Sequence, residues 1–271
     1  MKATGDLWVA EEFPTEDLIF YHGTSAAAGL AIIKEGTRSS VFDENGAKNL
    51  AREILSALLD CAKLSPGEES RLHFAFNGPG SEYSTLWVSA LRDQDKADGR
   101  TAFGYGHFYV TLNIGNAYRY AIGNPYRSEF LLAIAMSLKV LEHEGHPLPH
   151  EIETRYPEVH KAITIASPPA VLEVRGISRD RLLTENGDTN IDAHLRLYHM
   201  DGLTSRVNMP LAFRVLSVSA AEIIAIHDLS DWPKEELQDS MWQPKPERVA
   251  EVRLSVREWR RHASRNPHDG K

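Results

Sequence analysis

Short apolar runs with the character of buried strands recur along the chain, and segments with helical spacing separate them irregularly. Strands are predicted at residues 17–21, 85–91, 107–112 and 170–176, with two more inside 211–229. Helices are predicted, from amphipathic spacing and end signals, at residues 26–36, 46–64, 128–144 and 244–263. This order lacks the regular strand–helix–strand alternation of a parallel sheet, so a mixed α and β fold of another kind is expected.

The composition is that of a globular chain long enough to bury a full core. The chain has 271 residues, of which 42% are hydrophobic and 25% charged, and its formal net charge is −8. That charge disfavours a protein that coats the phosphates of nucleic acids. The one cysteine, Cys61, falls in a predicted helix and excludes a disulfide framework, and no run reaches the ~18 apolar residues of a membrane span. A cytoplasmic protein without membrane attachment is expected.

Two separated motifs carry the functional signal. The first is YHGT, residues 21–24, which follows the apolar run of the first predicted strand. The second starts at Tyr109, and a further tyrosine, Tyr120, stands eleven residues later. In this order, and with a predicted helix after the first motif, they resemble the ADP-ribosyltransferases of the diphtheria-toxin type, which include the poly(ADP-ribose) polymerases. The resemblance extends over separate blocks rather than the whole chain.

The resemblance implies an α+β fold with a split antiparallel β-sheet core and surrounding helices. It also implies that NAD is the substrate, cleaved at the bond between nicotinamide and ribose, and that no metal ion takes part. By the same resemblance, Gly23 binds the carboxamide of nicotinamide, His22 the ribose, and Tyr109 and Tyr120 the nicotinamide ring, with Thr24 completing the first motif.

These residue types suit that task. Two tyrosine rings can enclose a nicotinamide ring, and stacked aromatic pairs contribute about 0.5–1.5 kcal/mol beyond area burial. A glycine lets backbone N–H and C=O groups approach a carboxamide where a Cβ would interfere, and a histidine can hydrogen-bond ribose hydroxyls. Loss of nicotinamide passes through an oxocarbenium-like transition state, so positioning and electrostatic stabilisation are expected to dominate catalysis.

The chain departs from the family pattern at the third signature position, which is usually a glutamate that opens a late strand. Here that position falls on Met209, or on Asn208 with a shift of one residue, and neither is acidic. Three interpretations remain open: transfer of single ADP-ribose units without the glutamate, a carboxylate supplied by Glu173, Glu185 or Glu222, or binding of NAD or ADP-ribose without turnover. Chain extension into poly(ADP-ribose) is not expected on any of them.

The expected activity is therefore mono-ADP-ribosylation of a macromolecular target, with protein favoured over nucleic acid as the acceptor. A toxin, effector or defence role is suggested by analogy alone, and the family leaves room for an inhibitory partner. A catalytically inactive NAD- or ADP-ribose-binding module and an NAD glycohydrolase remain as alternatives. An RNA 2′-phosphotransferase shares the fold, but Tyr109 stands where that group resembles a second histidine.

The rest of the chain adds an expected domain boundary and two arginines. Residues 1–229 are expected to form the catalytic domain and 230–271 a helical C-terminal extension. Arg38 and Arg100 are candidate ligands of the NAD diphosphate, because a guanidinium offers a bidentate fork to phosphate oxygens. The histidines and glutamates of residues 142–151 lack the HExxH spacing and are interrupted by glycine and proline, so no metal site is predicted there.

Overall fold

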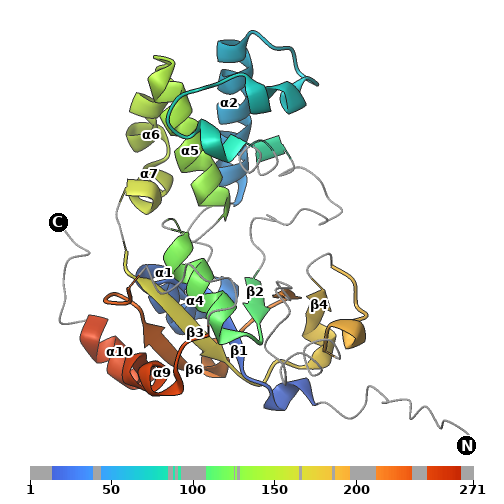
Figure 1. Cartoon of the computed structure of the whole chain (residues 1–271), viewed down its shortest axis with the longest axis vertical. Helices are drawn as coiled ribbons and strands as arrows, with labels where there is room; N and C mark the ends of the chain where they lie inside the picture. Colours follow the sequence, from blue (N-terminus) through green and yellow to red (C-terminus); the bar gives the residue numbers. More distant parts are fainter. Residues whose placement is uncertain are drawn as a thin grey trace, which may run out of the picture.

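The computed structural model describes residues 14–38, 44–84, 88, 91–92, 108–124, 126, 129–164, 167–184, 187–195, 212–233 and 243–263. Within these residues, seven strands form one sheet in the order β4-β5-β2-β1-β3-β6-β7 (Figure 1). Every neighbouring pair is antiparallel. The strands are β1 (Phe20–Ser25), β2 (Phe108–Thr111), β3 (Pro169–Val174), β4 (Leu182–Thr184), β5 (Ala212–Val215), β6 (Ile223–Asp228) and β7 (Arg253–Ser255). The expected α+β class with an antiparallel sheet is confirmed.

Helices cover both faces of this sheet. Gly23 and Thr24 are neighbours on β1, so they point to opposite faces. A Cβ on Gly23 would meet the backbone of α4 (Ile114–Gly123) at 2.5 Å, whereas Cγ2 of Thr24 lies 3.7 Å from the Cβ position of Gly29 in α1 (Ala26–Glu35). The two sides of the sheet are therefore named the α4 face and the α1 face. The C-terminal helices α9 (Pro246–Val252) and α10 (Val256–Ala263) pack against the α4 face and the α1 face respectively.

Local signals explain where the two sheet-covering helices begin and end. Ser25 caps α1, since its side chain accepts a hydrogen bond from the N–H of Ala28 at 3.1 Å. The first residue after α1, Gly36, has φ of +74°, a conformation that glycine adopts without steric cost. Asn113 caps α4 in the same way, because its side chain accepts from the N–H of Asn116 at 3.1 Å.

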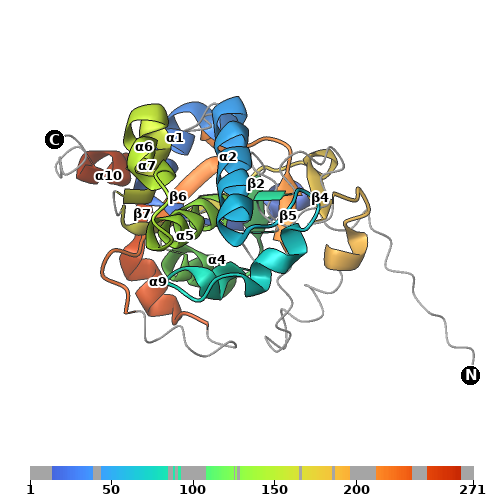
Figure 2. The ribbon, with the colours of Figure 1, turned by 90° about the horizontal axis from the view of Figure 1, so that it is seen from above.

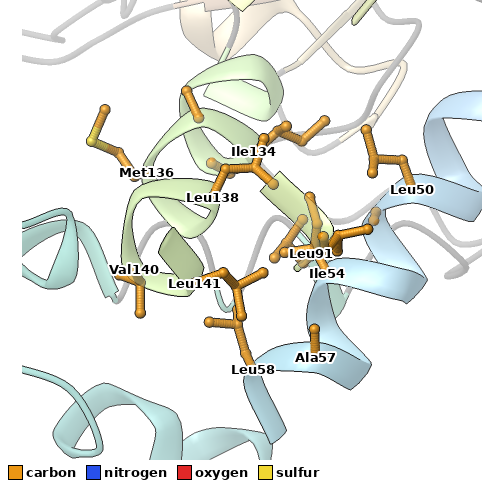
Figure 3. Packing of buried hydrophobic residues seen from close by; sticks show 14 of the residues in the cluster. Leu50, Ile54, Ala57, Leu58, Leu91, Ile134, Met136, Leu138, Val140 and Leu141 are labelled. Atoms are coloured by element: carbon orange, nitrogen blue, oxygen red, sulfur yellow. The ribbon is translucent and has the colours of Figure 1, made fainter. Parts of the chain in front are cut away.

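A second hydrophobic core lies outside the sheet, between helices of two separate chain segments. The helical bundle consists of α2 (Glu44–Ala62), α5 (Glu129–His143), α6 (Leu148–Arg155) and α7 (Pro157–Thr164), and Figure 1 shows it gathered above the sheet. Viewed from above, α2 and α5 run next to each other (Figure 2). Their buried side chains face each other, with Leu50, Ile54 and Leu58 of α2 directed at Ile134, Leu138 and Leu141 of α5 (Figure 3).

Two strand predictions are wrong in extent or type. The first strand is Phe20–Ser25 rather than residues 17–21, so the YHGT motif lies within β1 and not in a turn after it. The segment 85–91 is not a strand where it is described, since Val88 and Leu91 are helical and belong to the core of the bundle. Their spacing of three residues puts both on one helix face, and burial there outweighs the strand propensity of the run.

The C-terminal segment differs from the single amphipathic helix that was predicted over 244–263. Arg253, Leu254 and Ser255 form β7, which pairs with β6 at the edge of the sheet and separates α9 from α10. Leu254 and Trp259 pack into the core of the α1 face, and Trp259 is 4% exposed. This segment therefore adds a strand to the sheet and side chains to the core of the α1 face. Among the described helices, none combines the length and the apolar character needed to cross a lipid bilayer.

Candidate functional site

The site starts from a hydrogen bond between the two predicted motifs. Nδ1 of His22 on β1 lies 2.7 Å from the carbonyl oxygen of Tyr109 on β2, and because a carbonyl only accepts, Nδ1 carries the proton. Burial lowers the pKa of His22 to about 4, although its bond to Tyr109 acts in the opposite direction. The ring is therefore neutral at pH 7, which leaves Nε2 as a hydrogen-bond acceptor. Its plane stacks on Phe108, with ring centroids 3.9 Å apart.

The backbone of Gly23 faces the same junction. The N–H of Ala26 donates to the carbonyl of Pro168 at 2.8 Å, so these two residues form the next pair after Ser25 and Pro169, the last pair of the β1–β3 register. Since hydrogen-bonded positions alternate along an antiparallel pair, the N–H and C=O of His22 point to β3 and those of Gly23 point away from it, toward β2. The described register between β1 and β2 is a single pair, Tyr21 with Thr111, so the ladder stops before it reaches Gly23.

Helix α4 brings Tyr120 to this glycine. A Cβ built on Gly23 would lie 2.5 Å from the carbonyl oxygen of Ala117, 3.1 Å from the amide nitrogen of Ala121 and 3.1 Å from Cδ1 of Tyr120. Only glycine lets the helix approach the strand this closely, because the nearest obstacles are backbone atoms that cannot move aside. The Tyr120 ring remains 37% exposed. Glycine was predicted here for access to a ligand, and the structure adds a second reason, the packing of α4.

Tyr109 lies on the α4 face, the same face as Gly23. The β1–β2 pair places Tyr21 and Thr111 on one face, and Tyr109, two residues from Thr111, shares it. The partner of Tyr109 on β5 is Arg214, which is therefore on this face too. Its Nη1 lies 3.6 Å from the Cβ position of Gly187, and no hydrogen bond or ion pair joins its guanidinium to another residue of the described part of the chain.

The remaining predicted site residues are not brought to this junction. Thr24 is 3% exposed and packs toward α1. Arg38 ends the short helix Gly36–Arg38, and its side chain lies outside the described part of the structure. Asn208 and Met209, the two candidates for the third position, lie outside the described residues. So do Arg100 and Glu185.

Two of the three alternative carboxylates are engaged in ion pairs. Glu173 accepts hydrogen bonds from His227 at 2.7 Å and from Arg253 at 2.9 and 2.7 Å. Glu222 accepts from Arg181 at 3.2 Å and from the N–H of Ser219 at 2.7 Å. Each carboxylate therefore has a structural role.

Sequence reasoning missed Arg214 and the partners of Glu173. The alternation of AFRV, residues 212–215, would have placed Arg214 on a strand face, but the pairing with Tyr109 depends on a strand order that no local signal gives. No cluster of three or more histidine, cysteine or acidic side chains suited to a metal ion occurs in the part of the chain that is described. Nothing matches the chain among protein-family models, curated proteins or solved structures.

Proposed function

We propose that the chain binds NAD at the junction of β1, β2 and α4, breaks its nicotinamide–ribose bond and transfers single ADP-ribose units to a macromolecular acceptor, with protein favoured over nucleic acid. One observation carries the proposal: His22, Gly23, Tyr109 and Tyr120, chosen from the sequence as a nicotinamide site, come from elements that adjoin one another at this junction, with the His22 ring stacked on Phe108 at the α1 face and the other three residues on the α4 face. The first and third share a 2.7 Å hydrogen bond, and the Tyr120 ring lies against Gly23.

The carboxamide of nicotinamide fits the interrupted ladder. Its N–H₂ group can donate a hydrogen bond and its carbonyl oxygen can accept one, as the peptide groups of a neighbouring strand do. Gly23 offers the complementary acceptor and donor toward β2, and the carbonyl of Tyr109 is already occupied by His22. The rings of Tyr109 and Tyr120 can then flank the nicotinamide, and Nε2 of neutral His22 can accept a hydrogen bond from a ribose hydroxyl.

The reaction needs little covalent chemistry from the protein. The C1′–N bond breaks, its electron pair passes to the pyridinium nitrogen, and the ring leaves as neutral nicotinamide while the positive charge passes to the ribose. The acceptor then forms a bond to C1′ and releases its proton to water. The chain's contribution is to hold the ring and the ribose in position while positive charge moves onto the sugar. Arg214 pairs with Tyr109 across β2 and β5, and we expect its guanidinium to bind the diphosphate that follows the ribose.

A second function, binding of NAD or ADP-ribose without turnover, is favoured by the ion pairs of Glu173 and Glu222. With both carboxylates engaged, neither can stabilise the cationic sugar without losing its partner. Released nicotinamide separates the two functions, and released nicotinamide without a labelled acceptor indicates an NAD glycohydrolase.

The test uses purified protein, adenylate-labelled NAD and a whole-cell lysate. Free nicotinamide and label on the protein and nucleic-acid fractions are followed together. Label on one fraction that disappears in both His22→Ala and Tyr109→Ala is expected, whereas Tyr156→Phe, a change in the helical bundle, retains it. Label that persists in both site variants contradicts the proposal. Calorimetric binding of NAD with no nicotinamide released supports the binding module instead.

A further inference from the structure

A chain of hydrogen bonds outside the proposed ligand contacts connects the sheet to α4. Arg253 donates through Nε and Nη2 to the two carboxylate oxygens of Glu173, at 2.9 and 2.7 Å. Nε2 of His227 donates to the same carboxylate at 2.7 Å, and Nδ1 of His227 shares a 2.6 Å hydrogen bond with the hydroxyl of Tyr118. Tyr118 and His227 are fully buried and Glu173 is 4% exposed. These four residues are termed the α4 anchor.

The ionised carboxylate fixes the bonds that it receives. Burial opposes ionisation of Glu173, but the hydrogen bonds from His227 and Arg253 outweigh it and lower the pKa of the carboxyl to about 2. The carboxylate only accepts, so Nε2 of His227 carries a proton, and Nδ1 forms the second hydrogen bond of the ring, with the hydroxyl of Tyr118. Burial and the charge of Glu173 raise the pKa of Tyr118, which keeps its hydroxyl protonated. At the buried end of this network, both ring nitrogens of His227 and the hydroxyl of Tyr118 are hydrogen-bonded.

Three members of the anchor belong to the sheet and one to the helix. Glu173, His227 and Arg253 come from the adjacent strands β3, β6 and β7, and His227 pairs directly with Arg253. Tyr118 reaches them from α4, and its ring meets Trp232 edge-on with centroids 5.0 Å apart. The hydrogen bond between Tyr118 and His227 therefore joins the helix to the paired strands β3, β6 and β7.

The same helix carries Tyr120 on another side. Residues two apart on a helix do not share a face, so Tyr118 and Tyr120 point in different directions. Between them, the backbone at Ala117 and Ala121 lies against Gly23. The helix is thus located by two contacts, its backbone on Gly23 and Tyr118 in the anchor, and the place of the Tyr120 ring follows from both.

We propose that Glu173, His227 and Tyr118 are positioning residues for the nicotinamide site, which hold α4 so that the Tyr120 ring stays at its place beside Gly23. The identity of the ligand rests on the proposed function, whereas the attachment of α4 does not. The anchor also gives Glu173 a task that conflicts with direct use of its carboxylate on a sugar.

Three substitutions in the anchor and one control test this role. Tyr118→Phe removes only the hydroxyl, and His227→Leu removes both ring nitrogens. His227→Gln is the conservative rescue, because its amide still supplies one acceptor and a donor. Tyr156→Phe is the matched control: its hydroxyl also joins two elements, through a 2.8 Å bond to Glu53, but it does so in the helical bundle.

Two quantities are measured on each variant: the dissociation constant of nicotinamide by calorimetry and amide hydrogen exchange over residues 114–123. We expect Tyr118→Phe and His227→Leu to raise the dissociation constant about fivefold to tenfold, the worth of one buried hydrogen bond, and to speed exchange in α4. His227→Gln is expected to stay within about twofold of the wild type, because its bonds are retained. Tyr156→Phe is expected to change neither quantity.

Equal nicotinamide affinity and equal α4 exchange in Tyr118→Phe and Tyr156→Phe overturn the positioning role. So does a His227→Gln variant that fails as completely as His227→Leu. A wild-type protein that binds no nicotinamide overturns the proposed function and the nicotinamide role of the anchor together. The exchange of α4, measured without ligand, shows in that case whether the anchor itself holds the helix, so the two failures are distinguishable.

Discussion

Nδ1 of His22 donates to the carbonyl oxygen of Tyr109 at 2.7 Å, at the point where the described ladder between β1 and β2 has stopped. A side chain thus occupies a carbonyl that a continued ladder would have given to the N–H of Gly23. This bond holds β1 and β2 together at Gly23, while the N–H and C=O of Gly23 still point into the space between the two strands. Ordinary strand pairing would have consumed the donor and acceptor that a carboxamide requires.

Titration of His22 should make stability depend on pH in a defined window. Its pKa of about 4 in the folded chain lies below the ordinary value of 6.5, so between these values the unfolded chain binds a proton that the folded chain excludes. The contribution of this group to the free energy of unfolding is therefore complete above pH 6.5 and is lost as the pH falls toward 4. Denaturant unfolding at pH 7.5 and pH 5 measures the difference.

The matched variant for this prediction is His22→Asn, which keeps a donor for Tyr109 and does not titrate. We expect the loss of unfolding free energy between pH 7.5 and pH 5 to be larger in the wild type than in His22→Asn. The pKa of Glu173 is lowered from 4.5 to about 2, so the contribution of this carboxyl to the free energy of unfolding is complete above pH 4.5 and is the same in both proteins across the interval. An equal loss in the two proteins would contradict the burial of neutral His22.

A methyl group on Gly23 should displace α4. In Gly23→Ala the new Cβ lies 2.5 Å from the carbonyl oxygen of Ala117, and since this is backbone, strand and helix must separate. We expect a loss of about 1–3 kcal/mol in the free energy of unfolding, as for other overpacked sites, together with loss of nicotinamide binding. Gly123→Ala is the control, because nothing lies within 4 Å of its Cβ position. Similar unfolding free energies for the two variants would contradict the close contact.

Local signals in the sequence were sufficient for much of the site but not for its supports. The apolar runs at 17–21 and 107–112 and the glycine that ends the helix predicted at 26–36 all act over a few residues, and the elements that they predict are present. The two motifs lie on neighbouring strands, although β1 extends over Phe20–Ser25 rather than residues 17–21.

The supports of α4 could not be predicted because their contacts join distant parts of the chain. Tyr118 and His227 are 109 residues apart, and Glu173 and Arg253 are 80 apart. Neither pair has a spacing that secondary structure would reveal. The C-terminal segment could not be predicted for the same reason. Leu254 was predicted in a helix but lies in β7, which pairs with β6. A short segment next to a free sheet edge gains hydrogen bonds that its own sequence does not indicate.

The ring of Tyr120 should contribute affinity for nicotinamide with little effect on stability. The residue is 37% exposed, so we expect Tyr120→Ala to lower the free energy of unfolding less than truncation of a fully buried aromatic residue would. Its stacking on a bound ring is worth about 0.5–1.5 kcal/mol, which corresponds to a roughly twofold to tenfold weaker affinity for nicotinamide. Tyr120→Phe retains the ring and should bind as the wild type does. If calorimetry gives the same dissociation constant for the alanine variant, Tyr120 does not contact the ligand.

Substitution of Arg214 should weaken binding of the diphosphate part of NAD and leave binding of its nicotinamide part unchanged. It faces the same side of the sheet as its partner Tyr109, and a guanidinium there can bind the diphosphate but is not needed for the nicotinamide ring. Charge-assisted hydrogen bonds are worth about 1.5–3 kcal/mol, so Arg214→Gln should weaken binding of NAD and ADP-ribose about tenfold to a hundredfold. Its affinity for nicotinamide alone should be unchanged.

The control for Arg214→Gln is Arg175→Gln, which removes a guanidinium that is paired with Asp17 on the surface. Both variants lose one positive charge, so a purely long-range effect of charge on an anionic ligand would weaken ADP-ribose binding equally in the two. A loss specific to Arg214→Gln indicates a direct contact. If ADP-ribose affinity is preserved in Arg214→Gln, the diphosphate runs in another direction from the junction of β1 and β2, and Arg38, at the end of the short helix after α1, becomes the next arginine to substitute.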